Sequence, residues 1–331
     1  MKKTLALFTL LFSVFINFAQ DVNIDDLLNE NNKQKDYVSA TFKGTRLING
    51  HTVETTKKHA LDFLITHRFG DMGVKGVSGH TLFGIDNASD IQFVFEYGIT
   101  DDITVGFSRT QGAGKVRELY TGLFKYRVYK QTTNNKRPFT ITLLGNATIS
   151  SMKKQSDPLL ISSFPKFSNR MSYLVQAMVA RKFNKWLTIQ ITPTFLWRNL
   201  VDYNDNNGLF FMGLGARAKI SKRSAIVFEY YLPLMGKGQN YREYFPMIRG
   251  KKDASYYPSL HIGYELETGG HVFHINLTNS AGLLENDYLP FNNKNWAQGG
   301  FRLGFTISRG FYFSKGTNAW TGKPKKTKEA Q

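Results

Sequence analysis

The stretch IQFVFEYGITDDITVGF, residues 91–107, decides the fold. In its first half, apolar side chains occupy every second position from Ile91 to Tyr97, and polar Gln92 and Glu96 lie between them. The second half repeats this alternation after a short polar turn. A period of two places neighbouring side chains on opposite faces of a β-strand. The stretch therefore predicts two antiparallel strands joined by a tight turn, each with one apolar and one polar face.

The same alternation returns along most of the chain. No long segment repeats every 3.6 residues, as an amphipathic helix would. The alternating segments are about ten residues long, the length that a tilted strand needs to cross a bilayer. About twelve such segments occur, at 61–69, 91–97, 103–108, 120–128, 139–146, 172–179, 187–195, 210–220, 226–232, 260–266, 273–277 and 301–308.

The connections between these segments alternate in length. Short ones lie at 100–102, 131–137, 184–185, 221–223 and 268–270. Long ones lie at 70–89, 111–117, 152–169, 198–208, 236–257 and 279–297. Transmembrane barrels have short periplasmic turns and longer outer loops, whereas a soluble β-sandwich has no reason to alternate its loops. We therefore predict an all-β, transmembrane, antiparallel up-and-down β-barrel of about 12 strands over residues 59–313, with every long loop outside.

Aromatic residues mark several of the expected strand ends. Rings at these positions are typical of the girdles at the two membrane interfaces. The candidates are Tyr129, Trp186, Trp197, Tyr256, Tyr257, Trp296, Phe311, Tyr312 and Phe313.

The N-terminus has the pattern of a secretory signal. Lys2 and Lys3 precede an apolar run from Leu5 to Phe18, and the small residue Ala19 follows. The run is too short to span a bilayer as a helix. We expect a cleavable signal peptide over 1–19 and export of the chain to the cell outer membrane.

The rest of the chain flanks the barrel. Residues 20–58 form an N-terminal lead, and residues 314–331 a basic tail with Lys323, Lys325, Lys326 and Lys328. Within the lead, 37–56 has strand character and a turn signal at Asn49-Gly50. A single strand here would give an odd count, so we favour a periplasmic or lumenal segment. The alternative is a barrel of 14 strands that uses 37–56 as a hairpin.

Two runs carry a family resemblance. FKGTRLINGHTVETTKKHALDFLITHRFGD (42–71) and LFGIDNASDIQFVFEYGITDDITVGFSRT (82–110) resemble a domain family of unknown function, an outer-membrane β-barrel family of Bacteroidota. The resemblance covers about residues 36–313. It implies a porin-like barrel in the outer membrane and no particular activity. One departure is visible, because such barrels often end at an aromatic residue and here a basic tail follows Phe313.

Charged residues between the apolar positions should face the lumen, since Arg or Lys on the lipid face costs about 2–4 kcal/mol at mid-membrane. Two roles are open for these charged residues. Either they form a structural network that partly fills a narrow lumen, or they select small polar or anionic solutes in a passive pore. The formal net charge of +18 favours anions. The predicted polar network consists of Asp62, Arg68, Glu96, Lys125, Arg127, Arg217, Lys219, Glu229, His261, Glu265, His274 and Arg302.

Other functions have weaker sequence support. A scaffold barrel would bind a partner through its loops or through 37–56. A lipid hydrolase would need a Ser–His pair, for which His67 with Ser108 or Ser89 is the candidate, yet no motif marks a nucleophile.

The chain has no Cys, and we predict no catalytic residue, no metal site and no cofactor. The expected partners are outer-membrane lipid, lipopolysaccharide and small anionic solutes rather than nucleic acid, because the chain is exported.

Overall fold

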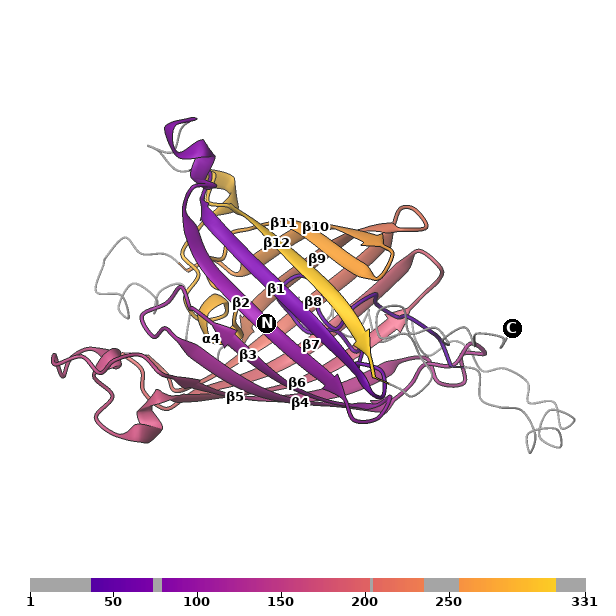
Figure 1. The fold of residues 1–331 in the computed structure, drawn as a ribbon, viewed down its shortest axis with the longest axis horizontal. Coiled ribbons are helices and arrows are strands. Elements are labelled where there is room, and N and C mark those ends of the chain that lie inside the picture. The colour runs from indigo at the N-terminus through magenta and orange to yellow at the C-terminus, as the bar shows by residue number, and fades with distance from the viewer. Residues whose placement is uncertain (1–36, 74–78, 203–204, 235–255, 314–331) are drawn as a thin grey trace, which may run out of the picture. The chain divides into compact units, whose positions relative to one another are not determined.

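Twelve antiparallel strands form a closed barrel (Figure 1). The computed structural model describes residues 37–73, 79–202, 205–234 and 256–313. The predicted signal peptide and basic tail, most of the lead before Tyr37 and most of the loop at 236–257 lie outside these residues. The strands are β1 (Ala60–Asp71), β2 (Ala88–Gly98), β3 (Ile103–Thr110), β4 (Leu119–Tyr129), β5 (Thr140–Ser150), β6 (Met171–Lys182), β7 (Leu187–Arg198), β8 (Gly208–Lys219), β9 (Ser224–Leu234), β10 (Ser259–Thr268), β11 (His271–Thr278) and β12 (Arg302–Tyr312).

The first and last strands close the barrel. β1 pairs with β2 on one side and with β12 on the other, in a register that sets Ile65 opposite both Phe93 and Ile307. Closure leaves no strand edge, and in hydrocarbon this is the only way a sheet can satisfy its backbone hydrogen bonds. The prediction of 12 strands is confirmed, and the alternative of 14 is wrong. Residues 37–58 make only isolated bridges, at Tyr37, Arg46 and Lys58.

The two faces of the wall differ as the alternation predicts. On β2 the side chain of Phe95 is 42% exposed, whereas that of its neighbour Glu96 is 0% exposed. Val175 on β6 and Ile275 on β11 are likewise exposed, and Gln176 and Asn276 beside them are buried. Apolar side chains thus cover the outer surface, and most polar ones point into the enclosed interior.

Connections of alternating length join the strands. One barrel end, here the short-turn end, carries the turns β2–β3, β4–β5, β6–β7, β8–β9 and β10–β11, and the other is the long-loop end. The helical turns within the described ranges lie in long loops: η2 (Gly79–Gly84), η3 (Ile161–Ser163), η4 (Phe167–Arg170), α4 (Glu285–Tyr288) and η5 (Trp296–Gln298). No helix in the described ranges is both long enough and apolar enough to cross a bilayer.

Two expectations about the long-loop end are wrong. The β11–β12 loop, expected outside, turns back into the lumen and brings α4 with it. Tyr256, expected at the membrane interface, is 1% exposed because its hydroxyl donates to the Leu289 carbonyl oxygen inside this loop. Trp186 and Trp197 are exposed on the outer surface, as expected of girdle residues.

The outer face yields a stability prediction. Val175 lies outward near the middle of β6, and Ile220 is exposed beside the β8–β9 turn. We expect Val175→Arg to destabilise the folded barrel by about 2–4 kcal/mol and Ile220→Arg by about 0–1 kcal/mol, because the cost of a charge depends on its depth in the bilayer. Urea unfolding in lipid vesicles measures both. Equal costs for the two variants would contradict the membrane-spanning orientation.

Candidate functional site

Residues 41–56 fill the lumen from the short-turn end as a U-shaped segment, here the N-terminal insert. Both of its flanks bond to backbone at that end, in the hydrogen bonds Val38 N–Gln131 O (2.8 Å) and His59 N–Gly98 O (2.8 Å). Its apex is the predicted Asn49-Gly50 turn, closed by a hydrogen bond from Leu47 N to Gly50 O (3.0 Å). The segment with strand character thus lies in the lumen rather than in the wall.

A single carboxylate of the wall binds this apex. Glu229, at the middle of β9, accepts hydrogen bonds from the backbone N–H groups of Ile48 (2.8 Å), Asn49 (3.1 Å) and Gly50 (3.0 Å). Charge-assisted bonds of this kind are about twice as strong as neutral ones. A glycine is required at position 50, because a Cβ there would overlap the hydroxyl of Tyr231.

Side chains from other strands satisfy the rest of the insert backbone. Lys125 on β4 donates to the carbonyl oxygens of Thr45 (3.3 Å) and Glu54 (3.1 Å). Gln190 on β7 accepts from Val53 N (3.0 Å) and donates to the His51 carbonyl oxygen (2.8 Å). Further bonds come from Thr104, Thr142 and Thr188, on β3, β5 and β7. Since buried backbone groups need partners, these polar side chains bind the insert as a ligand would be bound.

Arg68 on β1 joins the insert to β11. Its guanidinium donates to the Asn276 side chain on β11 (2.7 Å) and to the Asn49 side chain at the apex (2.7 Å). A second cluster links three strands without the insert: Arg217 donates to Glu265 (2.6 Å), and Glu265 lies 3.3 Å from His274. Each of these buried charges therefore has a polar partner, which is an amide for Arg68 and an opposite charge for Arg217.

The other members of the predicted network lie at different depths. Asp62 accepts from Thr56 (2.9 Å), Glu96 lies 3.6 Å from Arg46, and Arg127 contacts Asp102 (2.9 Å) and Glu54 (3.5 Å). Arg302 pairs with Asp71 (2.7 Å), and the His261 ring packs edge-on against Tyr288. Lys219 is exposed, so its placement in the enclosed interior is corrected. Lys219 is the last residue of β8, at the end of the strand where the wall meets solvent.

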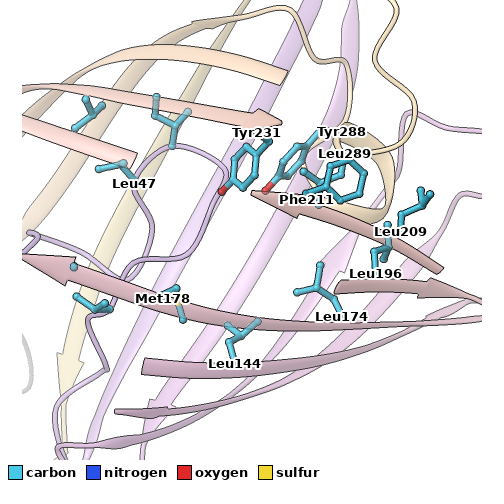
Figure 2. Close-up of a cluster of buried hydrophobic side chains, with 14 of the residues drawn as sticks. Leu47, Leu144, Leu174, Met178, Leu196, Leu209, Phe211, Tyr231, Tyr288 and Leu289 are labelled. Atoms are coloured by element: carbon cyan, nitrogen blue, oxygen red, sulfur yellow. The ribbon is translucent and has the colours of Figure 1, made fainter. Parts of the chain in front are cut away.

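One side of the lumen is apolar, which the alternation did not predict. Figure 2 shows this cluster, in which Leu47 of the insert lies among side chains from β5 to β9 and from the β11–β12 loop. A sequence signal exists, because apolar residues occupy both phases at Leu143–Leu144 and Phe210–Phe211. Strands covered on both faces have such continuous apolar runs. The inward members on the wall are Leu144, Leu174, Met178, Leu196, Leu209, Phe211, Val227 and Tyr231.

Residues 279–292 fill the long-loop half of the lumen and are here the loop insert. Asp90 on β2 accepts from Leu283 N (2.9 Å), and Ser89 donates to the Ala281 carbonyl oxygen (3.2 Å). Tyr288 packs against Tyr231 with ring centroids 5.4 Å apart, as Figure 2 shows.

Asp287 anchors the loop insert to the β3–β4 loop by accepting a hydrogen bond from Ala113 N (3.2 Å). The pKa of Asp287 is raised to about 8, chiefly by burial and in smaller part by the neighbouring carboxylate of Asp90. The N–H groups of Ala113 and Gly114 and the charge of Arg117 act in the opposite direction. The anchoring carboxyl is therefore protonated at neutral pH.

The two inserts meet in a seam at mid-lumen. His51 Nε2 lies 3.7 Å from Glu285 Oε1, and Asn49 donates weakly to the Gly282 carbonyl oxygen (3.4 Å). Burial lowers the pKa of His51 well below its usual range and raises that of Glu285, so burial disfavours the charged form of both groups. Neither side chain has a hydrogen-bond partner among the described residues.

A cavity of about 10 Å³ lies beside Glu285, between the loop insert and the walls of β5, β6 and β7, which is barely room for one water molecule. The polar contacts between the two inserts are long, at 3.4 and 3.7 Å. Each insert forms shorter hydrogen bonds with the wall, such as Ile48 N to Glu229 (2.8 Å) and Leu283 N to Asp90 (2.9 Å).

The geometry does not assemble the hydrolase pair considered from the sequence. His67 packs against Phe69 and Phe305 on the outer face, whereas the Ser108 side chain is buried in the lumen. Ser89 is bonded to the loop insert. In the described ranges no three His, Asp or Glu side chains converge as metal ligands.

Three solved structures resemble the barrel. The NanC porin is 9% identical, with a TM-score of 0.43 over 77% of this chain and 100% of its own. An outer membrane channel from Pseudomonas putida F1 is 14% identical, with a TM-score of 0.45 over 78% and 98%. Outer membrane phospholipase A from Escherichia coli is 12% identical, with a TM-score of 0.39 over 77% and 91%. Likeness this distant carries no argument about activity.

The sequence itself provides the firmer comparison. No curated protein matches the chain. The profile of one family, described as a membrane-bound β-barrel domain, matches residues 42–311. The match begins inside the N-terminal insert and ends in β12, so it includes the insert as well as the complete wall. The protein therefore belongs to the family of membrane-bound β-barrel domains called DUF5777.

Proposed function

We propose that the protein is an outer-membrane pore for small polar or anionic solutes that is closed by its own two inserts. The burial of the lumen wall carries this proposal. Arg68, Lys125, Glu229 and His261 lie on four different strands, and none is more than 2% exposed. A water-filled channel would leave such side chains accessible. The open form of the pore therefore requires movement of the inserts.

The inserts close the lumen in series. The N-terminal insert bonds to strands around the barrel, from β3 and β4 to β7 and β9. The loop insert contacts β2 and β10, and the cavity beside it is bounded by β5, β6 and β7. Each insert thus spans the cross-section at its own depth, and the weak seam between them allows one to move without the other.

The preferred solute follows from the charges that opening would expose. Without Lys219, which is exposed, the predicted network includes five Lys or Arg and four Asp or Glu, a difference of one positive charge. A narrow lumen of low dielectric strengthens the field of such an excess. Anions and polar solutes would therefore be favoured over cations, but only modestly because the excess is small and several of the charges are ion-paired.

The apex of the N-terminal insert provides a first test. We expect Gly50→Ala to loosen the insert by about 1–3 kcal/mol, because the added methyl overlaps the Tyr231 hydroxyl. Trypsin should then cleave after Arg46, which is buried in the unsubstituted protein. The matched control is Gly50→Ala combined with Tyr231→Phe, which removes the hydroxyl and should restore part of the protection. Unchanged protection in Gly50→Ala would contradict the tight fit.

Conductance in planar bilayers tests the arrangement in series. We expect no steady conductance from the unsubstituted protein, from a variant with 41–56 replaced by a Gly-Ser linker, or from one with 280–291 so replaced. The variant with both replacements should conduct, because only then is the lumen free along its whole length. Heat-modifiable migration on gels shows that each variant is folded. A folded double variant that is silent would refute the pore, and a steadily conducting unsubstituted protein would refute the closure.

The anchor at Asp287 predicts a pH dependence. In the inserted loop its carboxyl stays protonated up to about pH 8, whereas in a released loop it ionises near its ordinary pKa of 3.8. Stabilisation of the inserted form is therefore complete below about pH 4 and is lost as the pH rises to about 8. In the variant lacking 41–56, which has no steady conductance, brief openings should become more frequent over this pH range. Asp287→Asn in the same background should abolish the increase, and an equal increase would exclude Asp287 as its cause.

A further inference from the structure

The chain from 119 to 201, which comprises β4 to β7, has an uneven charge. It contains 13 Lys or Arg residues and a single acidic residue, Asp157. Some of these cations are occupied within the protein: Lys125 holds the N-terminal insert, Arg127 pairs with Asp102, and Arg198 pairs with Asp205. The excess is too large for such pairing to absorb, so one flank of the barrel is strongly basic.

Two arginines of this flank lie on aromatic rings at the short-turn end. The guanidinium of Arg137 lies 5.0 Å from the ring centre of Tyr129. That of Arg181 lies 5.3 Å from the ring of Phe183 and 5.8 Å from that of Phe139. These five residues, here the Arg–aromatic patch, come from the ends of β4 and β6, from the β4–β5 turn just before β5, and from the start of the β6–β7 turn.

The patch faces away from the lumen. On β6 the neighbours of Arg181 point inward, since Ala180 is 1% exposed and Lys182 donates to the Ser39 carbonyl oxygen of the lead segment. Alternation therefore places Arg181 on the outer surface. Phe183 and Trp186, in the β6–β7 turn, are also exposed there. The patch thus lies where the aromatic girdle of a membrane barrel meets lipid headgroups.

The two guanidiniums have no anionic partner among the residues that the structure describes. Neither Arg137 nor Arg181 forms a salt bridge with a described residue, in contrast to Arg127, Arg198, Arg217 and Arg302. Nε of Arg181 is buried and has no hydrogen-bond partner among the described residues. Stacking on a ring fixes the plane of a guanidinium and leaves its N–H edge directed at the surroundings. This geometry suits bidentate binding of a phosphate.

We propose that the Arg–aromatic patch binds the phosphate of an anionic phospholipid in the leaflet at the short-turn end. Short turns lie on the periplasmic side of outer-membrane barrels, so this leaflet contains phospholipid. The rings contact the upper acyl chains and the glycerol region, and the two guanidiniums share the phosphate. The proposal requires the barrel to lie in a membrane, but it does not depend on whether the barrel conducts.

Trp186, exposed in the turn beside Phe183, is a natural reporter. Replacing Trp197, Trp296 and Trp320 by Phe leaves it as the only tryptophan of the chain. The protein is refolded in phosphatidylcholine vesicles that contain a fixed fraction of either brominated phosphatidylglycerol or brominated phosphatidylcholine. Quenching of Trp186 by the two brominated lipids gives their relative affinity for the patch.

We expect the affinity ratio to favour phosphatidylglycerol by about fivefold or more, since one basic side chain at a membrane surface contributes about that factor. Arg137→Gln with Arg181→Gln should reduce the ratio to about one. The control Lys222→Gln with Arg223→Gln removes the same charge from the β8–β9 turn at the same barrel end and should leave the ratio unchanged. Equal quenching by both lipids in the unsubstituted protein, or an equal loss in the control, would overturn the proposal.

A charge-conserving variant keeps the test decisive if the double Gln variant does not fold. Arg137→Lys with Arg181→Lys retains both charges but loses the planar, ring-stacked donor pair. It should lower the ratio substantially while the control stays high. An unchanged ratio in this variant would show that the charge alone attracts the lipid and that the patch is not a built site.

Discussion

The pairing of β1 with β12 is the constraint on which the rest of the structure depends. It removes both sheet edges, which hydrocarbon would not tolerate, and it separates the side chains into an outer and an enclosed set. The outer set needs only to be apolar. The enclosed set contains charged groups such as Arg68, Lys125 and Glu229, and burying them without partners would be costly. The enclosed charges therefore need water or protein groups as partners, and in this structure the partners are protein groups.

The N-terminal insert meets that requirement with its backbone rather than its side chains. Glu229 binds three consecutive N–H groups and Lys125 binds two carbonyl oxygens, so wall charges are matched by peptide dipoles. The same bonds satisfy a non-helical segment at membrane depth, which is tolerated only inside protein. The apolar side of the lumen then packs Leu47 and its neighbours. The insert and the wall thus stabilise each other, and this mutual dependence explains why the family match includes both.

The loop insert is held differently. Its anchor, Asp287, is buried beside a second carboxyl, and the loop meets the N-terminal insert through the long contacts of His51 with Glu285 and of Asn49 with Gly282. Because the protonated carboxyl of Asp287 ionises as the pH rises, the inserted form of this loop loses stability at high pH. The closed lumen therefore combines one insert bound through its backbone with a second insert whose stability depends on pH.

The sequence by itself determined the wall. Alternation and loop lengths predicted twelve antiparallel strands and an outer apolar face, because a period of two and a bilayer thickness are local constraints that each segment obeys alone. The Asn49-Gly50 turn could be predicted for the same reason. Only the tertiary structure decided what fills the barrel: that 41–56 enters from one end, that 279–292 folds in from the other, and that Tyr256 is buried and Lys219 exposed. Those contacts join residues about 180 positions apart, such as Asn49 and Glu229, and no local pattern records which distant carboxylate a turn will bind.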